Sequence, residues 1–82
     1  MLTEERKRDL VRLLKEKLEH SRIQIRRARD EAMKEIDVRE KAKEISEDDR
    51  FRQKQEVEKI VGECNKKIED LGVSKEREIM SG

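Results

Sequence analysis

Four arginines fall within the eight residues of the segment RIQIRRAR, residues 22–29, in a chain whose formal net charge is only +1. On a helix that turns by about 100° per residue, Arg22, Arg26 and Arg29 form one file along the axis, whereas Arg27 points away from it. Guanidinium groups spaced over about two helical turns can reach successive phosphates of one nucleic-acid backbone. A phosphate-binding surface is therefore one of two interpretations of this spacing.

The alternative is that these arginines form an ordinary solvated helix face. Charged residues make up 52% of the chain, so an arginine-rich face arises easily. A net charge near zero gives no attraction of the whole molecule to nucleic acid, so binding would depend on the local file. Only 1% of the residues are aromatic, so a nucleic acid would be contacted at its backbone and by its shape rather than through base stacking.

No combination of residues predicts catalysis. His20 falls on the polar side of its helix and is expected to be a surface residue. Cys64, the one cysteine of the sequence, falls on an apolar stripe and is expected to be a buried structural thiol. The sequence contains no Gly-rich phosphate loop, HExxH motif or CxxC motif. We therefore expect no enzyme activity, no catalytic residue, no metal site and no cofactor.

Two helix-start signals divide the chain. Thr3 is followed directly by two glutamates, which suits an N-cap with acids at the positive end of the helix dipole. Ser46 is followed by three acids, and the last of them, Asp49, stands at the capping-box position. No alternation of apolar and polar residues competes for a strand. The sequence therefore predicts an all-α fold.

The predicted architecture is a single helical hairpin over residues 1–82, with helices at about 4–43 and 47–80 and a turn at about 44–46. A connection this short makes the two helices antiparallel. Apolar residues recur at steps of three and four, as in a coiled coil. The predicted stripe comprises Val11, Leu14, Leu18, Ser21, Ile25, Ala28, Ala32 and Ile36 on the first helix and Val57, Val61, Cys64, Ile68 and Leu71 on the second, with Ile60 and Ile79 beside it.

Gly72 raises the question of whether the second helix ends early. A glycine directly after Leu71 can act as a C-cap, with a fresh turn starting at Val73. The next segment, SKEREIM at residues 74–80, continues the helical charge pattern. We therefore expect one continuous second helix.

The first helix carries further apolar residues outside the stripe, namely Leu10, Leu13, Ile23 and Met33. Two helices alone give poor cover to these side chains, because their core is only one layer deep. The sequence therefore predicts that the hairpin is part of a three-helix bundle, completed by another part of a larger protein or by a second copy of this chain. We expect this chain to self-associate as a homo-oligomer.

Membrane contact is not predicted. No apolar run approaches the roughly 18 residues of a membrane span, and the N-terminal segment MLTEERKRDL lacks the apolar core of a signal peptide. Acids balance the bases along both helices, which argues against an amphipathic helix on a membrane surface. We therefore expect a cytoplasmic protein.

Four segments, in order and in register, resemble the C-terminal part of bacterial ribosome recycling factor. They are LTEERKRDLV at residues 2–11, SRIQIRRARDEA at 21–32, KEISEDD at 43–49 and KEREIM at 75–80. The likeness extends over essentially the whole chain without a gap and includes the capping turn, which composition does not dictate. It implies the second and third helices of a three-helix bundle, without the first helix and without the α/β domain inserted after it.

The resemblance also implies a function. In this family the bundle lies against large-subunit ribosomal RNA, and the factor acts with elongation factor G to split post-termination ribosomes into subunits. The family's bundle arginines map onto Arg26 and Arg29, with Arg22 in the same file, and Asp30 stands where the family commonly has a second arginine. By this resemblance the chain is a translation factor fragment that binds rRNA and is inactive in recycling alone. The alternative is a self-associating structural hairpin that does not bind RNA.

Overall fold

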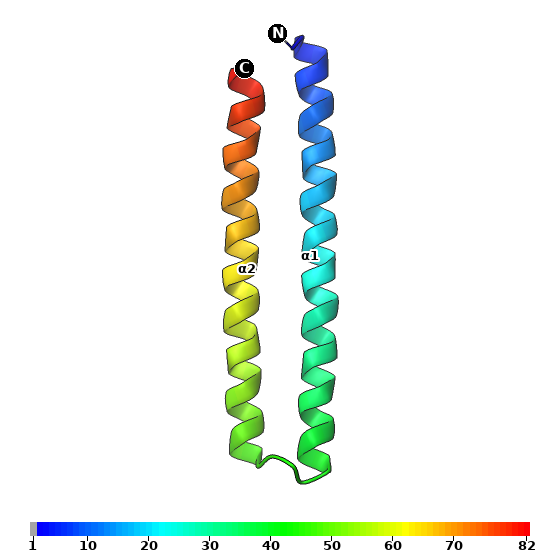
Figure 1. Cartoon of the computed structure of the whole chain (residues 1–82), viewed down its shortest axis with the longest axis vertical. Helices are drawn as coiled ribbons and strands as arrows, with labels where there is room; N and C mark the ends of the chain where they lie inside the picture. Colours follow the sequence, from blue (N-terminus) through cyan, green and yellow to red (C-terminus); the bar gives the residue numbers. More distant parts are fainter. Residues whose placement is uncertain (1) are drawn as a thin grey trace.

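Two long helices lie side by side and antiparallel in the computed structural model, which describes residues 2–82 (Figure 1). α1 is Glu4–Lys41 and α2 is Glu47–Ser81, and the Cα positions extend over 61 × 15 × 10 Å. No strand occurs in the part of the chain that the structure describes. The predicted all-α antiparallel hairpin is confirmed, and Met1 of the predicted range lies outside the described residues.

Both helices begin at the predicted N-caps. Thr3 Oγ1 accepts a hydrogen bond from Arg6 N at 3.2 Å. Ser46 Oγ accepts from Asp49 N at 3.0 Å, and Asp49 Oδ2 accepts in return from Ser46 N at 3.2 Å, which completes a capping box. These side chains satisfy amide donors that have no acceptor within the helix. The hydrogen bonds from Ser46 also hold the pKa of the Asp49 carboxyl below its usual value.

The first helix ends at Lys41 rather than near residue 43. Lys43 adopts a φ of 61°, which lies in the left-handed region and stops the helix. Glu44 N donates a hydrogen bond to Arg39 O at 2.9 Å, and Lys43 N donates to Glu40 O at 2.9 Å. These bonds satisfy carbonyl groups of the last helical turn, so the chain can reverse within residues 42–46.

Apolar side chains form the seam between the helices, although this seam is thin. Ile36, at 6% exposure, is the one hydrophobic side chain classed as buried among the described residues. Most of the predicted stripe is half-buried in the seam, namely Val11, Leu14, Leu18, Ser21, Ile25, Ala32, Val57, Val61, Cys64 and Ile68. Cys64 is therefore less deeply buried than predicted, and its thiol is free. His20 is exposed, as predicted.

Two predicted stripe positions are wrong, since Ala28 and Leu71 are exposed. α2 continues without a break, so a step of four residues from Ile68 reaches Gly72 instead of Leu71. Gly72 is buried, and a Cβ atom built on it would lie only 2.6 Å from Cδ1 of Leu18. The glycine therefore leaves space in the seam for Leu18 and does not end the helix, which confirms the expected continuous helix.

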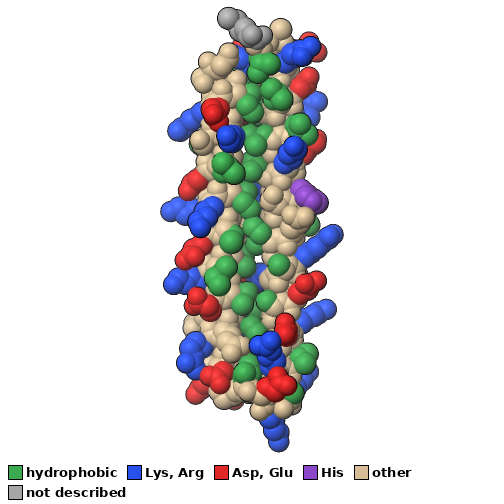
Figure 2. Space-filling model, in the orientation of Figure 1, with side chains coloured by type: hydrophobic (Ala, Val, Ile, Leu, Met, Phe, Trp, Pro, Cys, Tyr) green, Lys and Arg blue, Asp and Glu red, His purple; other side chains and the backbone are tan. Residues whose placement is uncertain are grey.

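A large part of the apolar surface is left uncovered by the hairpin. Leu10 and Leu13 are exposed, whereas Ile23 and Met33 are half-buried. On α2, Ile60 is exposed and Ile79 is half-buried. Figure 2 shows apolar side chains in a nearly continuous line along the groove between the helices, with charged side chains along both edges. The expected shortage of cover for the first helix is thus seen at Leu10 and Leu13.

Charged contacts between the helices gather beside the turn. Asp37 Oδ1 lies 2.8 Å from Arg50 Nε and 2.8 Å from Lys54 Nζ, and Arg50 Nε also lies 3.2 Å from Glu40 Oε2. Hydrogen bonds from Lys54 and then from Arg50 lower the pKa of the Asp37 carboxyl to about 2. At the open end, Lys7 Nζ donates to Met80 O at 3.2 Å. The end beside the turn is therefore the more strongly cross-linked one.

Candidate nucleic-acid interface

The structure brings the three arginines of the predicted file together. Arg22, Arg26 and Arg29 line one surface depression of about 260 Å³ on α1, with Val61 and Asn65 of α2 on its other side. The three side chains come from successive turns of α1, because they are spaced by four and three residues. The predicted file thus forms one side of a shallow groove whose other side is α2.

Arg29 is the most strongly held of the three. Its Nε donates a hydrogen bond to Glu58 Oε1 on α2 at 2.6 Å, and its Nη1 lies 3.3 Å from Asp30 Oδ1. These carboxylates, Glu58 first, raise the pKa of the Arg29 guanidinium above its usual value. Arg29 therefore remains positively charged, but much of its field is neutralised within the protein.

Arg22 and Arg26 are less constrained. Arg22 Nη1 lies 3.6 Å from Glu19 Oε2, a pair on one exposed helix face that contributes little to stability. Arg26 is exposed and has no ion-pair partner within residues 2–82. Arg26 is thus the member of the file whose charge is most available to an external anion.

Arg27, which the spacing directs away from the file, is exposed and does not line the depression. It lies about 100° around α1 from Arg26, on the outer surface of the hairpin. The division of the arginine-rich segment into a file of three and one outward residue is therefore present in the structure.

Sequence reasoning missed the contribution of α2 to this groove. Glu58 and Asn65 are far from the arginines in sequence, and helix periodicity within one segment does not connect them. The position of the turn does carry a signal, because residues at similar distances from the turn face one another in an antiparallel hairpin. Arg29 and Glu58 lie at nearly equal distances from the turn at 42–46, so this register could have paired them.

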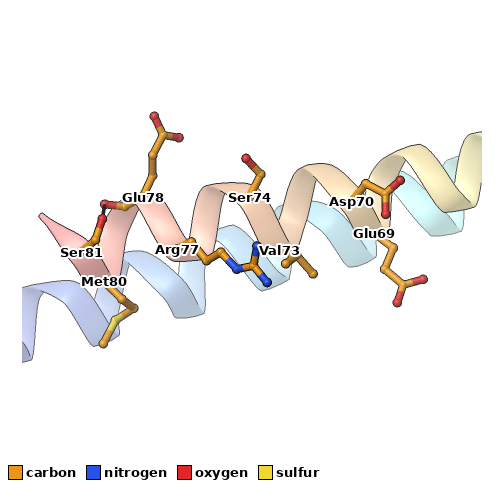
Figure 3. A pocket seen from close by; sticks show the side chains of 8 residues that line it. All are labelled: Glu69, Asp70, Val73, Ser74, Arg77, Glu78, Met80 and Ser81. Carbon is orange, nitrogen blue, oxygen red and sulfur yellow. Dashed lines mark hydrogen bonds between the residues drawn. The ribbon is translucent and has the colours of Figure 1, made fainter.

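A larger depression, of about 930 Å³, lies on the C-terminal part of α2 (Figure 3). It is lined by Glu69, Asp70, Val73, Ser74, Arg77, Glu78, Met80 and Ser81, all from this one helix. Three carboxylates and a single arginine make it unsuitable for phosphate. Figure 3 shows Ser81 hydrogen-bonded to the backbone of Glu78, an interaction of 3.4 Å within the last turn.

Residues 2–82 contain neither a metal-binding cluster nor a membrane-spanning helix. No group of three or more His, Cys, Asp or Glu side chains there has the geometry to hold a metal ion. Neither helix is apolar enough over a sufficient length to cross a membrane. The arginine-lined groove is therefore the candidate site that the described residues offer for a polyanion.

The family model described as ribosome recycling factor matches residues 1–80 of this chain. The chain belongs to the ribosome recycling factor family. This membership confirms the resemblance seen in the four sequence segments, and it assigns the hairpin to a family of translation factors that act on the ribosome. No solved structure matches the chain.

Individual ribosome recycling factors are similar over nearly the whole chain. The ribosome-recycling factor of Natranaerobius thermophilus is 41% identical over 80 residues, which are 98% of this chain and 44% of that protein. Those of Erythrobacter litoralis and Chloroflexus aggregans are 40% and 32% identical, each over 98% of this chain and 43% of the relative. The chain thus spans less than half the length of the ribosome recycling factors that it matches.

In this member of the ribosome recycling factor family, Asp30 has a direct effect on the groove. The resemblance places Asp30 where a second arginine is common, and the structure shows its carboxylate paired with Arg29 at 3.3 Å. The Asp30 carboxylate thus offsets part of the positive charge that Arg29 brings to the groove.

Proposed function

We propose that this hairpin is the rRNA-contacting part of a ribosome recycling factor and binds large-subunit ribosomal RNA through Arg22, Arg26 and Arg29. The observation that supports this most strongly is the convergence of these three guanidinium groups on one groove in a chain of this family. In this proposal the protein acts in the cytoplasm, where it takes part in the disassembly of post-termination ribosomes.

The three arginines contribute differently to binding. Arg26 makes the first charge-assisted contact to a phosphate, because no acid of the described residues competes for it. Arg29 is positioned by Glu58, which contacts its Nε and Nη2 atoms, and by Asp30, which contacts its Nη1 atom. It adds a weaker phosphate contact through the second N–H group of each Nη atom. The Asn65 amide, on the opposite wall, can donate to a phosphate or to a ribose 2′-hydroxyl. Together these groups recognise backbone and shape.

Ribosome splitting is not expected from the hairpin alone. The chain covers 44% or less of the relatives that it matches, so more than half of each relative has no counterpart in it. We propose that cooperation with elongation factor G depends on that remaining part. The activity proposed for this chain is therefore RNA contact without recycling.

The test is binding of the chain to purified large ribosomal subunits as a function of salt. Replacing both Arg26 and Arg29 with alanine should lower the affinity at least tenfold and reduce the slope of log K against log salt by about two, because about one counterion is released per phosphate contact. A matched control replaces Arg27 and Lys34, which are both exposed cations of α1, with alanine.

The Arg27/Lys34 control distinguishes binding at the arginine-lined groove from non-specific electrostatic attraction to RNA. Equal losses in the two double variants would indicate non-specific charge attraction and would contradict the assignment of the groove. Unchanged binding in the Arg26/Arg29 variant would also contradict it. If the unmodified chain showed no salt-dependent binding at all, the alternative of a purely structural hairpin would replace the proposal.

A further inference from the structure

Phe51 is the one aromatic residue of the chain, which has no tyrosine or tryptophan. Its side chain is 65% exposed, the highest value among the exposed large hydrophobic residues that the structure describes. It does not belong to the apolar line between the helices. Ile60, which borders an apolar depression between α1 and α2, is nine residues away and therefore about 180° around α2 from Phe51. Packing within the hairpin thus does not explain this aromatic ring.

Phe51 is aligned with the α2 side of the arginine-lined groove. Phe51, Glu58 and Asn65 are spaced by seven residues, so they share one side of α2. Glu58 accepts the hydrogen bond from Arg29 Nε at 2.6 Å, and Asn65 lines the depression that holds the arginine file. Two helical turns, about 10 Å, separate Phe51 from Glu58. The exposed ring therefore stands on the same face as the arginines, nearer to the turn.

The charges around Phe51 favour an uncharged group over a phosphate. The two arginines beside it in the sequence are already paired. Arg50 Nε lies 2.8 Å from Asp37 Oδ1, and Arg52 Nη2 lies 2.6 Å from Asp49 Oδ1. Acidic residues occupy the first turn of α2, directly before Phe51. Because these carboxylates repel a phosphate but not a nucleobase, an RNA strand bound at the arginine file can place a base, rather than its backbone, at this position.

We propose that the Phe51 ring stacks on an unpaired base of the RNA whose phosphates contact Arg26 and Arg29. This inference rests on the proposed function and adds a base contact to its backbone contacts. Stacking covers the exposed ring and needs no hydrogen bond, so the ring accepts any base. The bases of RNA loops and bulges are free to stack in this way, because they are not held within a duplex. The partner of Phe51 is therefore single-stranded RNA beside the backbone that the arginine file holds.

Affinity for purified large ribosomal subunits gives the first test. Phe51→Ala should weaken binding about tenfold, a typical effect of removing one base stack. The slope of log K against log salt should stay unchanged, because a stacked base releases no counterion. Phe51→Trp should bind at least as tightly as the original chain. The control is Val38→Ala, which should not change the affinity, because Val38 is 63% exposed and lies about 180° around α1 from Arg29.

Phe51→Leu distinguishes a base from a protein partner. Leucine keeps an apolar side chain but has no aromatic face, so this variant should lose nearly as much affinity as Phe51→Ala. If Phe51→Leu binds like the original chain while Phe51→Ala binds weakly, the partner is an apolar protein surface and the base contact is overturned. Unchanged binding of Phe51→Ala overturns it as well. A loss in the Arg26/Arg29 double variant would then leave the proposed function standing, whereas no loss in either variant would remove both proposals.

Fluorescence provides the second test, since the chain has no tryptophan of its own. Phe51→Trp introduces a single indole, and the probe is single-stranded oligoadenylate RNA at low salt. The intact strand should quench the indole at saturation, whereas a strand of the same length and charge with abasic residues should not. Equal quenching by the two strands, or none by the intact strand, would overturn the proposal.

Discussion

Arg29 and Glu58 join the two helices by a hydrogen bond of 2.6 Å across the groove in which the arginine file lies. The carboxylate holds the guanidinium in place and at the same time cancels part of its charge. The basic surface of α1 is therefore controlled from α2. This relationship leads to the first prediction.

Glu58→Gln should strengthen binding to large ribosomal subunits at low salt by roughly fivefold. The amide keeps a hydrogen-bond acceptor for Arg29 but removes the charge that competes with phosphate, and the gain is modest because ion pairs between exposed groups are weak. The measurement is a binding titration at 50 mM salt. Glu63→Gln, an exposed residue of α2 that points away from the groove, is the control. A gain of the same size in both variants would show that only net charge matters.

Acid should weaken the hairpin through Asp37. Its pKa is about 2 in the folded chain against an ordinary 3.8, because Lys54 and Arg50 stabilise the carboxylate. The Asp37 carboxylate therefore makes its full contribution to the free energy of unfolding above about pH 4. This contribution is lost as the pH falls through 2. The measurement is thermal unfolding, followed by circular dichroism between pH 6 and 2 at fixed protein concentration. The unfolding temperature should fall less with acid in Asp37→Asn than in the original chain. Asp70→Asn, on the outer side of α2, should leave the profile of the original chain unchanged.

Ser46→Ala should lower the free energy of unfolding by about 1 kcal/mol, because it removes the acceptor for Asp49 N at the start of α2. The measurement is urea unfolding. Ser74→Ala removes the same hydroxyl group from an exposed position within α2 and serves as the control. A loss of equal size in both variants would contradict a role for the capping box.

The two glycines inside α2 should respond differently to alanine. Gly62 has open space around it, so Gly62→Ala should stabilise the chain by up to ~1 kcal/mol through helix propensity. At Gly72 the new methyl group would meet Leu18 Cδ1 at 2.6 Å, and the repacking that follows should cost about 1–3 kcal/mol. Urea unfolding compares the two variants directly. Equal stabilisation by both would show that Leu18 moves aside without cost.

The helical architecture was predictable because it depends on local signals. The N-caps at Thr3 and Ser46 and the steps of three and four between apolar residues are readable from short segments. Both caps agree with the structure, and so does the apolar stripe except at Ala28 and Leu71. The exchange of Leu71 for Gly72 in the seam was not predictable in this way, because hydrophobicity favours leucine while the helix geometry places the glycine against Leu18.

The candidate site was predictable only in part. The alignment of Arg22, Arg26 and Arg29 follows from helical spacing, and the depression that they line contains all three. The neutralisation of Arg29 does not follow from spacing within α1, because Glu58 acts from the other helix. Contacts between helices depend on the register set by the turn, so the turn must be located before the partners of any one residue can be named.

The concentration of contacts near the turn bears on how the hairpin opens. Ile36, the capping box of Ser46 and the cluster around Asp37 all lie at the closed end, whereas the free end is joined by the bond from Lys7 to Met80 and by a 4.0 Å pair between Lys15 and Glu76. Separation of the two helices should therefore start at the termini and progress towards the turn. Amide hydrogens near the termini should exchange fastest, with protection rising along each helix towards residues 36 and 50.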